Sequence, residues 1–192
     1  MSLSKIDQLR LINNRHEEKI IRVGLGVSYF PLVRVTKDGG KIYDSMSGDI
    51  MGVKWVYEDS EVLLFSRNLI THVYPSVDLL YVIVIYSALS GNFRAPRNAV
   101  VYDAKGGLHK VLTPPAFTSK LVIENLKING HRNPPLSLEY DGALFFDSIS
   151  WQTHNDKTVT VARIVYDKEW HETRVLYPET CDFGECVHSG RL

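Results

Sequence analysis

Residues 79–89 read LLYVIVIYSAL, the longest nearly uninterrupted apolar run in the chain. A strand that is covered on both faces needs apolar side chains at consecutive positions, whereas a strand with one solvated face alternates apolar and polar residues. The run, taken as Val77–Ala88, therefore predicts a central strand with both faces buried. At 11 residues it is too short for a membrane-spanning helix, which needs about 20.

The composition of the whole chain also favours β-structure. The 192 residues are 44% hydrophobic and 23% charged, which is ordinary for a globular domain. Valine, isoleucine, threonine and the aromatic residues occupy 62 positions, against 7 alanines. Branched and aromatic side chains fit a pleated surface better than a helix, so most of the chain is expected to be sheet.

The N-terminal segment has a different periodicity. Leu3, Ile6, Leu9 and Ile12 recur every three residues, and Ser4 precedes Asp7 at the spacing of a helix N-cap. This pattern predicts one amphipathic helix over residues 4–17. The next segment, Ile21–Tyr29, alternates apolar and small or polar residues, which predicts a half-buried strand.

Turn residues punctuate the rest of the chain at short intervals. The expected hairpins pair Val33–Thr36 with Lys41–Tyr43, Val53–Tyr57 with Val62–Phe65, Ala99–Asp103 with Leu108–Leu112, Leu136–Tyr140 with Ala143–Phe146, Ile149–Thr153 with Thr158–Tyr166, and Thr173–Tyr177 with Glu185–His188. Lys120–Ile128 fits either a strand or a short helix. We expect one mainly β domain over 1–192, a hairpin-rich two-sheet sandwich or partly closed barrel with the helix 4–17 packed on an edge or open end.

Charge is balanced overall but unevenly distributed. The chain carries 22 basic and 22 acidic residues, so nothing attracts it generally to nucleic acid or an anionic membrane. Residues 79–138 have a net charge of +5 and residues 139–192 a net charge of −5. Either the two segments neutralise each other side by side, or they form a polarised surface for an oppositely charged partner. No secretion signal is visible, so a cytoplasmic location is expected.

Two loops in the positive segment combine Gly, Arg, Asn and Pro. One contains Arg94 and Arg97, and the other contains His131 and Arg132. Arginine binds carboxylate or phosphate through paired hydrogen bonds, so loops that meet at one rim would form an anion site. The alternative is that these residues simply make the loops polar.

No pattern in the chain indicates a metal centre or a catalytic centre. Cys181 and Cys186 have the paired spacing of zinc ligands, but Cys186 and His188 are too close to be typical and no second cysteine pair is present. A Cys181–Cys186 disulfide is unusual for a protein that is not exported. No Gly-x-Ser-x-Gly motif is present. We therefore predict no metal, no cofactor and no catalytic residue, and lean against an enzyme.

The leading functional hypothesis is a non-enzymatic domain that binds another protein. Trp170 follows Asp167-Lys168-Glu169 in a charged turn, where an exposed tryptophan would anchor an interface. Small hairpin-rich bacterial proteins that bind other proteins share this general pattern, although no motif identifies a family. The alternative is an enzyme or small-molecule binder that holds an anionic ligand at a loop rim formed by Arg94, Arg97, His131 and Arg132.

Overall fold

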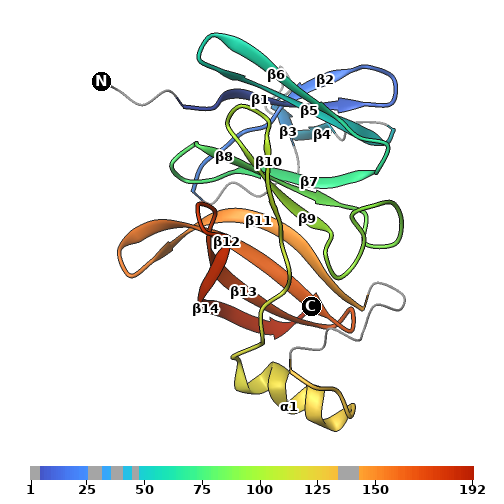
Figure 1. Cartoon of the computed structure of the whole chain (residues 1–192), viewed down its shortest axis with the longest axis vertical. Coiled ribbons are helices and arrows are strands. Elements are labelled where there is room, and N and C mark those ends of the chain that lie inside the picture. The colour runs from blue at the N-terminus through green and yellow to red at the C-terminus, as the bar shows by residue number, and fades with distance from the viewer. Residues whose placement is uncertain (1–4, 26–31, 36–40, 45–47, 134–142) are drawn as a thin grey trace.

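The computed structural model describes residues 5–25, 32–35, 41–44, 48–133 and 143–192, with backbone alone for 32–35 and 41–44. It contains three four-stranded antiparallel sheets, one two-stranded sheet and one helix. The mainly β, sandwich-like prediction is confirmed, and none of the described sheets closes into a barrel. Figure 1 shows the three large sheets stacked as layers, with the helix at the far end of the third.

Each large sheet is formed by strands that are near one another in sequence. The first sheet has the order β2 (Glu18–Ile20), β1 (Asp7–Asn13), β5 (Ile50–Tyr57), β6 (Ser60–Phe65). The middle sheet has the order β10 (Leu108–Val111), β9 (Ala99–Asp103), β8 (Tyr81–Tyr86), β7 (Ile70–Pro75). The third sheet has the order β11 (Leu144–His154), β12 (Lys157–Tyr166), β13 (Trp170–Tyr177), β14 (Asp182–Arg191). The remaining elements are β3 (Leu32–Val35), β4 (Lys41–Asp44) and α1 (Lys120–Ile128).

The middle sheet separates two hydrophobic cores. Val82 and Val84 of β8 belong to the core shared with the first sheet. Ile83 and Ile85 belong to the larger core, shared with the third sheet and α1. All four side chains are fully buried. The prediction that Val77–Ala88 contains a central strand with both faces covered is thus confirmed.

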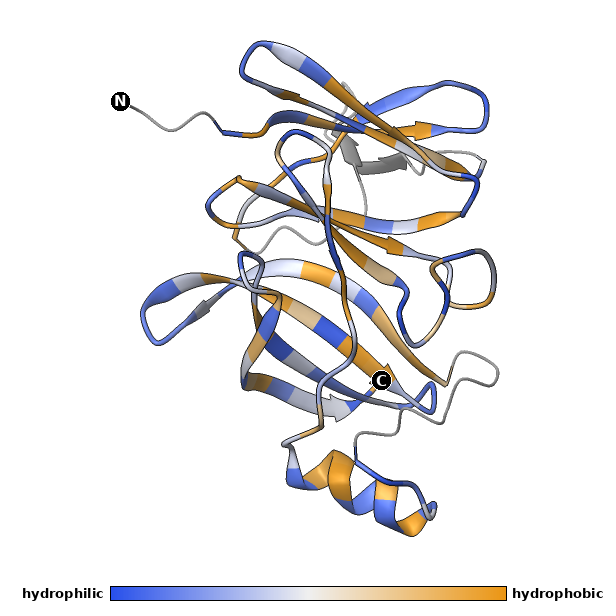
Figure 2. Cartoon of the chain, in the orientation of Figure 1, coloured by the Kyte–Doolittle hydropathy of each residue, from blue (hydrophilic) through white to orange (hydrophobic). Residues whose placement is uncertain are grey.

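Most of the expected hairpins are also present. The pairs β5–β6, β9–β10, β11–β12 and β13–β14 match predicted pairs, and β3 pairs with β4 as expected. Figure 2 shows hydrophilic residues at the β1–β2, β5–β6 and β11–β12 turns, as expected for chain reversals at the surface. The predicted strand Leu136–Tyr140 lies outside the described residues.

The predicted helix over residues 4–17 is wrong, because its described part forms β1 and the start of the β1–β2 hairpin. The register against β5 shifts between Asp7 and Arg10, and Gln8 has a left-handed backbone with φ +50°. This bulge adds one residue to the strand and so puts Ile6 and Leu9 on the same buried face, three positions apart. The spacing of three between buried apolar residues, which is typical of a helix, here results from a bulge in a strand.

The predicted strand Ile21–Tyr29 is wrong over its described part, because residues 21–25 contain no strand. Tyr74 of β7 holds this segment through hydrogen bonds between its hydroxyl and the backbone N–H and carbonyl of Gly24, at 3.0 and 3.2 Å. Ile21 and Val23 pack against the cores, which accounts for their apolar character.

The helix of the described structure is α1, in the segment that the sequence left open between strand and helix. Val122 and Leu126 are buried, one turn apart, against the core of the third sheet. Two prolines, Pro114 and Pro115, separate α1 from β10 and prevent the sheet from continuing.

Candidate functional site

The basic residues predicted to hold an anion lie on two separate parts of the molecule. Arg94 and Arg97 are exposed in the loop between β8 and β9, whereas His131 and Arg132 follow α1. Figure 1 shows the first loop beside the middle sheet and α1 beyond the third sheet. The ring of His131 contacts the edge of the Tyr166 ring, with 6.0 Å between centroids. Asn98, next to Arg97, bonds to Phe146 of β11, so both loops lie against the third sheet, and anion binding by these four residues stays a prediction.

Trp170 is not the freely exposed side chain that the sequence suggested. It is the first residue of β13, pairs with Arg191 of β14, and packs in part against the larger core. The Arg191 guanidinium lies 5.9 Å from the centre of the Trp170 ring, a cation–π contact. A role for Trp170 at an interface remains a prediction.

The cysteines form neither a disulfide nor part of a metal cluster among the described residues. Cys181 is buried and donates its thiol hydrogen to the Pro178 carbonyl, and burial raises the pKa of this thiol. Cys186 donates to the His188 carbonyl and also has a raised pKa, because it is desolvated. Raised thiol pKa values disfavour the thiolate that metal binding and nucleophilic attack require.

Two histidines of the third sheet lie side by side, with ring centroids 5.1 Å apart and planes 22° from parallel. His171 Nε2 and His188 Nδ1 are 3.0 Å apart and share one hydrogen. Burial lowers the pKa of His171, and the positive charge of Arg163 lowers it further. His171 therefore favours the neutral state, which fits a structural hydrogen bond between the two rings.

A buried ion pair on the opposite face of β13 anchors the start of α1. Glu172 is fully buried and accepts hydrogen bonds from the backbone N–H groups of Thr118, at 2.8 Å, and Ser119. Its other oxygen accepts from Arg174 at 3.2 Å. Arg174 also donates to the carbonyls of Ala116 and Gly184. The arrangement satisfies the polar groups of both side chains, and its role is to hold the helix on the sheet.

The strongest candidate for a functional surface is the outer edge of β6. The turn between β5 and β6 has two residues, Glu58 and Asp59, with φ of +51° and +59°. A two-residue turn of this kind closes on a hydrogen-bonded pair of residues, here Tyr57 and Ser60. Every second pair beyond it is then hydrogen-bonded, so alternate β6 residues direct their backbone groups toward β5.

The other β6 residues direct their backbone N–H and carbonyl groups away from β5. The alternation continues past the strand, because Ser66 donates to the Met51 carbonyl at 2.8 Å. The outward-directed residues are Glu61, Leu63 and Phe65. Since β6 ends the strand order of the first sheet, these groups have no strand partner among the described elements.

The same residues expose apolar side chains. Leu63 and Phe65 are each 56% exposed, whereas Val62 and Leu64 pack inward against the first core. The Phe65 ring lies across Gly52 of β5, where an added Cβ would come within 3.1 Å of the ring. The β6 edge, meaning Glu61, Leu63 and Phe65, therefore presents two exposed apolar side chains beside unpaired backbone groups, with the Phe65 ring stacked on His16 at 6.2 Å between centroids.

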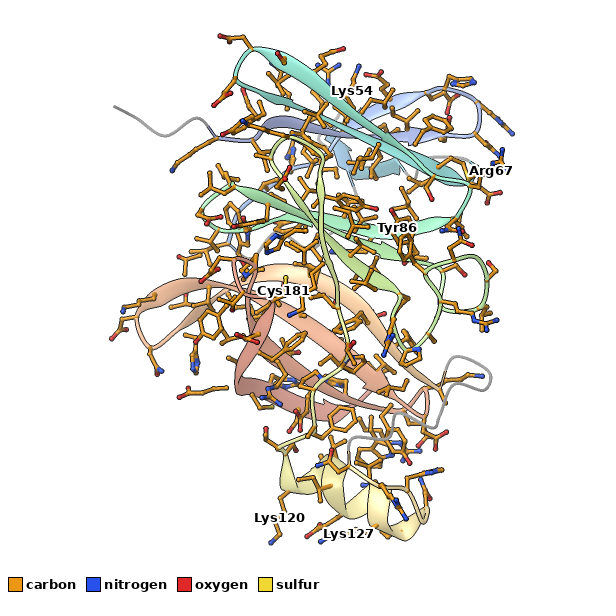
Figure 3. The ribbon with its side chains drawn as sticks, viewed as in Figure 1. Lys54, Arg67, Tyr86, Lys120, Lys127 and Cys181 are labelled. Atoms are coloured by element: carbon orange, nitrogen blue, oxygen red, sulfur yellow. The ribbon has the colours of Figure 1, made fainter. Side chains whose placement is uncertain are left out.

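Charged residues border the β6 edge. Lys54 lies opposite Leu63 on β5 and binds Glu18 at 2.7 Å and Glu61 at 3.5 Å. Figure 3 shows Lys54 on the first sheet, at the end of the molecule opposite α1. Hydrogen bonds from Lys54 and Arg10 lower the pKa of Glu18, and the bond to Glu18 raises the pKa of Lys54. Glu18 and Lys54 therefore stay ionised near neutral pH, and the part of the first sheet that they occupy stays hydrated.

The sequence predicted the β5–β6 hairpin but not its exposed apolar side chains. Residues 62–65 are all apolar, so periodicity alone does not tell which pair faces the core. The two-residue turn was the available signal, because its length sets the register.

Among the described residues of the positive and negative segments, 79–133 and 143–192, no side-chain ion pair joins one segment to the other. Instead, Lys110 donates to the carbonyl of Thr180, and Lys120 of α1 is 89% exposed. Figure 3 shows Lys120 and Lys127 at the far end of the molecule. Much of the basic charge is thus open to solvent.

Over its described residues the chain has no helix long and apolar enough to cross a membrane. No known protein family, no curated protein and no solved structure matches this chain.

Proposed function

We propose that this protein is a binding domain that captures an extended segment of another protein along the β6 edge. The observation that carries the proposal is the coincidence, at Leu63 and Phe65, of exposed apolar side chains with outward-directed backbone groups. Addition of a strand to a sheet edge uses these two features together, because main-chain hydrogen bonds give affinity and alternate side chains give specificity.

The composition of β6 supports this proposal. Edge strands that must stay unpaired usually carry lysine, proline or a bulge, which discourage pairing with another chain. β6 has the sequence SEVLLF, with Glu61 as its one charged residue, and its register against β5 is regular. The strand is therefore unprotected in the way expected of a docking edge.

The charges near the edge indicate the chemistry of the partner. Glu58, Asp59 and Glu61 lie at the turn end of β6, and the Glu61 side chain is 66% exposed. A matching segment has apolar residues at alternate positions and a lysine or arginine opposite this acidic end. A protein partner is accordingly favoured over a small anion.

The test is a selection of extended decapeptides from a displayed library against the whole chain, with Leu63→Pro as the counter-selection. Leu63→Pro removes an outward N–H while leaving the β5–β6 hydrogen bonds intact, so the variant should fold. Selected peptides should alternate apolar residues, protect the Glu61, Leu63 and Phe65 amides from hydrogen exchange, and bind Leu63→Pro at least about tenfold more weakly.

A matched variant separates the backbone from the side chain. Leu63→Ala keeps the N–H and should weaken binding less than Leu63→Pro. Peptides that bind Leu63→Pro as well as the original chain would overturn the proposal. A dimer of the free chain that Leu63→Pro dissociates would also overturn it, because the edge would then pair with a second copy.

A further inference from the structure

A cavity of about 350 Å³ lies where the N-terminal part of the first sheet meets the turn between β7 and β8 and the strand β11. Its walls are mainly apolar and come from all three large sheets. They include Ile6, Leu9, Ile21, Leu79 and Trp151. This volume is within the range of small-molecule sites, about 300–1,000 Å³. The cavity is separate from the β6 edge.

Hydrogen bonds hold the walls in place without a ligand. The Trp151 indole donates to the Pro75 carbonyl at 2.8 Å, which fixes the ring against β7. The Ile6 N–H donates to the Leu79 carbonyl at 2.8 Å, and this bond ties the first sheet to the β7–β8 turn. A ligand would therefore enter a cavity whose shape is already formed, which lowers the entropic cost of binding.

Two lining residues have strained backbones. Gln8 has φ +50° and Leu79 has φ +62°, in the left-handed region that side chains other than Gly, Asn and Asp seldom adopt. Such residues cost about 1–3 kcal/mol each and concentrate at ligand-binding sites. The bulge of β1 accounts for Gln8, and Leu79 lies in the turn between β7 and β8, so both backbone angles shape the walls of this cavity.

The polar side chains that line the cavity are those of Asp7, which is exposed, and Gln8. Asp7 lines it and has no ion-pair partner among the described residues, with one oxygen accepting the Gln8 N–H at 2.7 Å. The amide oxygen of Gln8 already accepts from Arg10 at 2.9 Å. The free acceptor capacity at the cavity thus belongs to a carboxylate beside an apolar wall.

We propose that this cavity binds a small amphiphilic amine, with its apolar body against Trp151 and Leu79 and its ammonium group at Asp7. An ammonium group close to a carboxylate near the protein surface gains free energy that a neutral or anionic head does not. The site therefore distinguishes ligands of equal length by the charge of the head group.

The test compares n-hexylamine, n-hexanol and hexanoate by calorimetry and amide chemical shifts on the whole chain. Hexylamine should bind saturably, with shifts centred on Asp7, Leu79 and Trp151, and at least about tenfold more tightly than hexanoate. Asp7→Asn should remove the preference for the amine over the alcohol. Ile20→Trp places a large ring at the rim of the cavity, where Ile20 is 53% exposed, and should abolish binding of the amine and of the alcohol.

Leu63→Pro is the control, because it alters the β6 edge and should leave amine binding unchanged. Equal affinity for hexylamine and hexanoate, an unchanged preference in Asp7→Asn, or shifts centred elsewhere would overturn the proposal. Absence of saturable binding in the original chain would overturn it as well.

Discussion

The buried pair Glu172–Arg174 makes a quantitative prediction about the stability of the third sheet. Glu172→Gln keeps the size of the side chain but removes its charge, and leaves the guanidinium of Arg174 buried without a counter-ion. Arg174 is 6% exposed and Glu172 is fully buried, so water cannot replace the lost partner. Removal of one member of a buried pair costs about 3–5 kcal/mol.

The hydrogen bonds around the pair indicate why replacing both members should not restore stability. Glu172 accepts from two backbone N–H groups before α1, and Arg174 donates to two backbone carbonyls. An apolar pair in their place would leave these four groups without partners, at about 1–3 kcal/mol for each group that water cannot reach. The double variant Glu172→Met/Arg174→Met should therefore remain less stable than the original chain.

Urea denaturation followed by tryptophan fluorescence measures these free energies. For a chain of this size, a loss of about 4 kcal/mol corresponds to a Tm lower by about 10 °C. Glu185→Gln is the matched control, because Glu185 lies on the neighbouring strand with a 72% exposed side chain and should change stability by less than about 1 kcal/mol. A Glu172→Gln variant within 1 kcal/mol of the original chain would refute the reasoning.

Two further predictions concern buried polar groups at the interface of the middle and third sheets. His72 is 3% exposed and donates from Nε2 to the Ile149 carbonyl, and burial lowers its pKa to about 4. The folded chain then takes up the proton at lower pH than the unfolded chain, so stability is full above about pH 6.5 and falls by roughly 3 kcal/mol toward pH 4. Equilibrium unfolding across this range should show the slope, and His72→Gln should flatten it; an unchanged slope in the variant would exclude His72 as the source. Asn98 donates to the carbonyls of Tyr86 and Phe146 and accepts from the Phe146 N–H. Asn98→Ala should cost at least about 3 kcal/mol by chemical denaturation, and a loss below 1 kcal/mol would contradict a bridging role.

Local patterns predicted the parts of the fold that depend on local chemistry. The run within Val77–Ala88 identified the central strand, because a strand buried on both faces cannot include polar residues at alternate positions. Turn residues identified the hairpins for a similar reason, since chain reversal needs particular backbone angles. Asp167 and Asn155, for example, lie in turns and have left-handed backbones.

Features that depend on the arrangement of distant segments were not predictable in this way. The loops that hold Arg97 and Arg132 have similar compositions, but one joins β8 to β9 and the other follows α1, and composition does not tell where such loops lie relative to each other. The period of three in the N-terminal segment arises from a bulge at Gln8, and a bulge has no distinct composition. Trp170 lies beside a charged turn in sequence but packs in part against the core, because β13 begins at this residue.

The β6 edge shows how one turn can decide what a surface presents. Residues 62–65 are all apolar, so either of the two possible registers against β5 would place apolar side chains in the core. The two-residue turn pairs Tyr57 with Ser60. In the register that follows from this pair, the side chains of Leu63 and Phe65 lie on the solvent face of the sheet. A turn one residue longer would instead expose Val62 and Leu64 and bury the other two, because side chains alternate between faces. The turn at Glu58 and Asp59 thus selects leucine and phenylalanine for the solvent face, and directs the backbone groups of these same residues to the free side of the sheet.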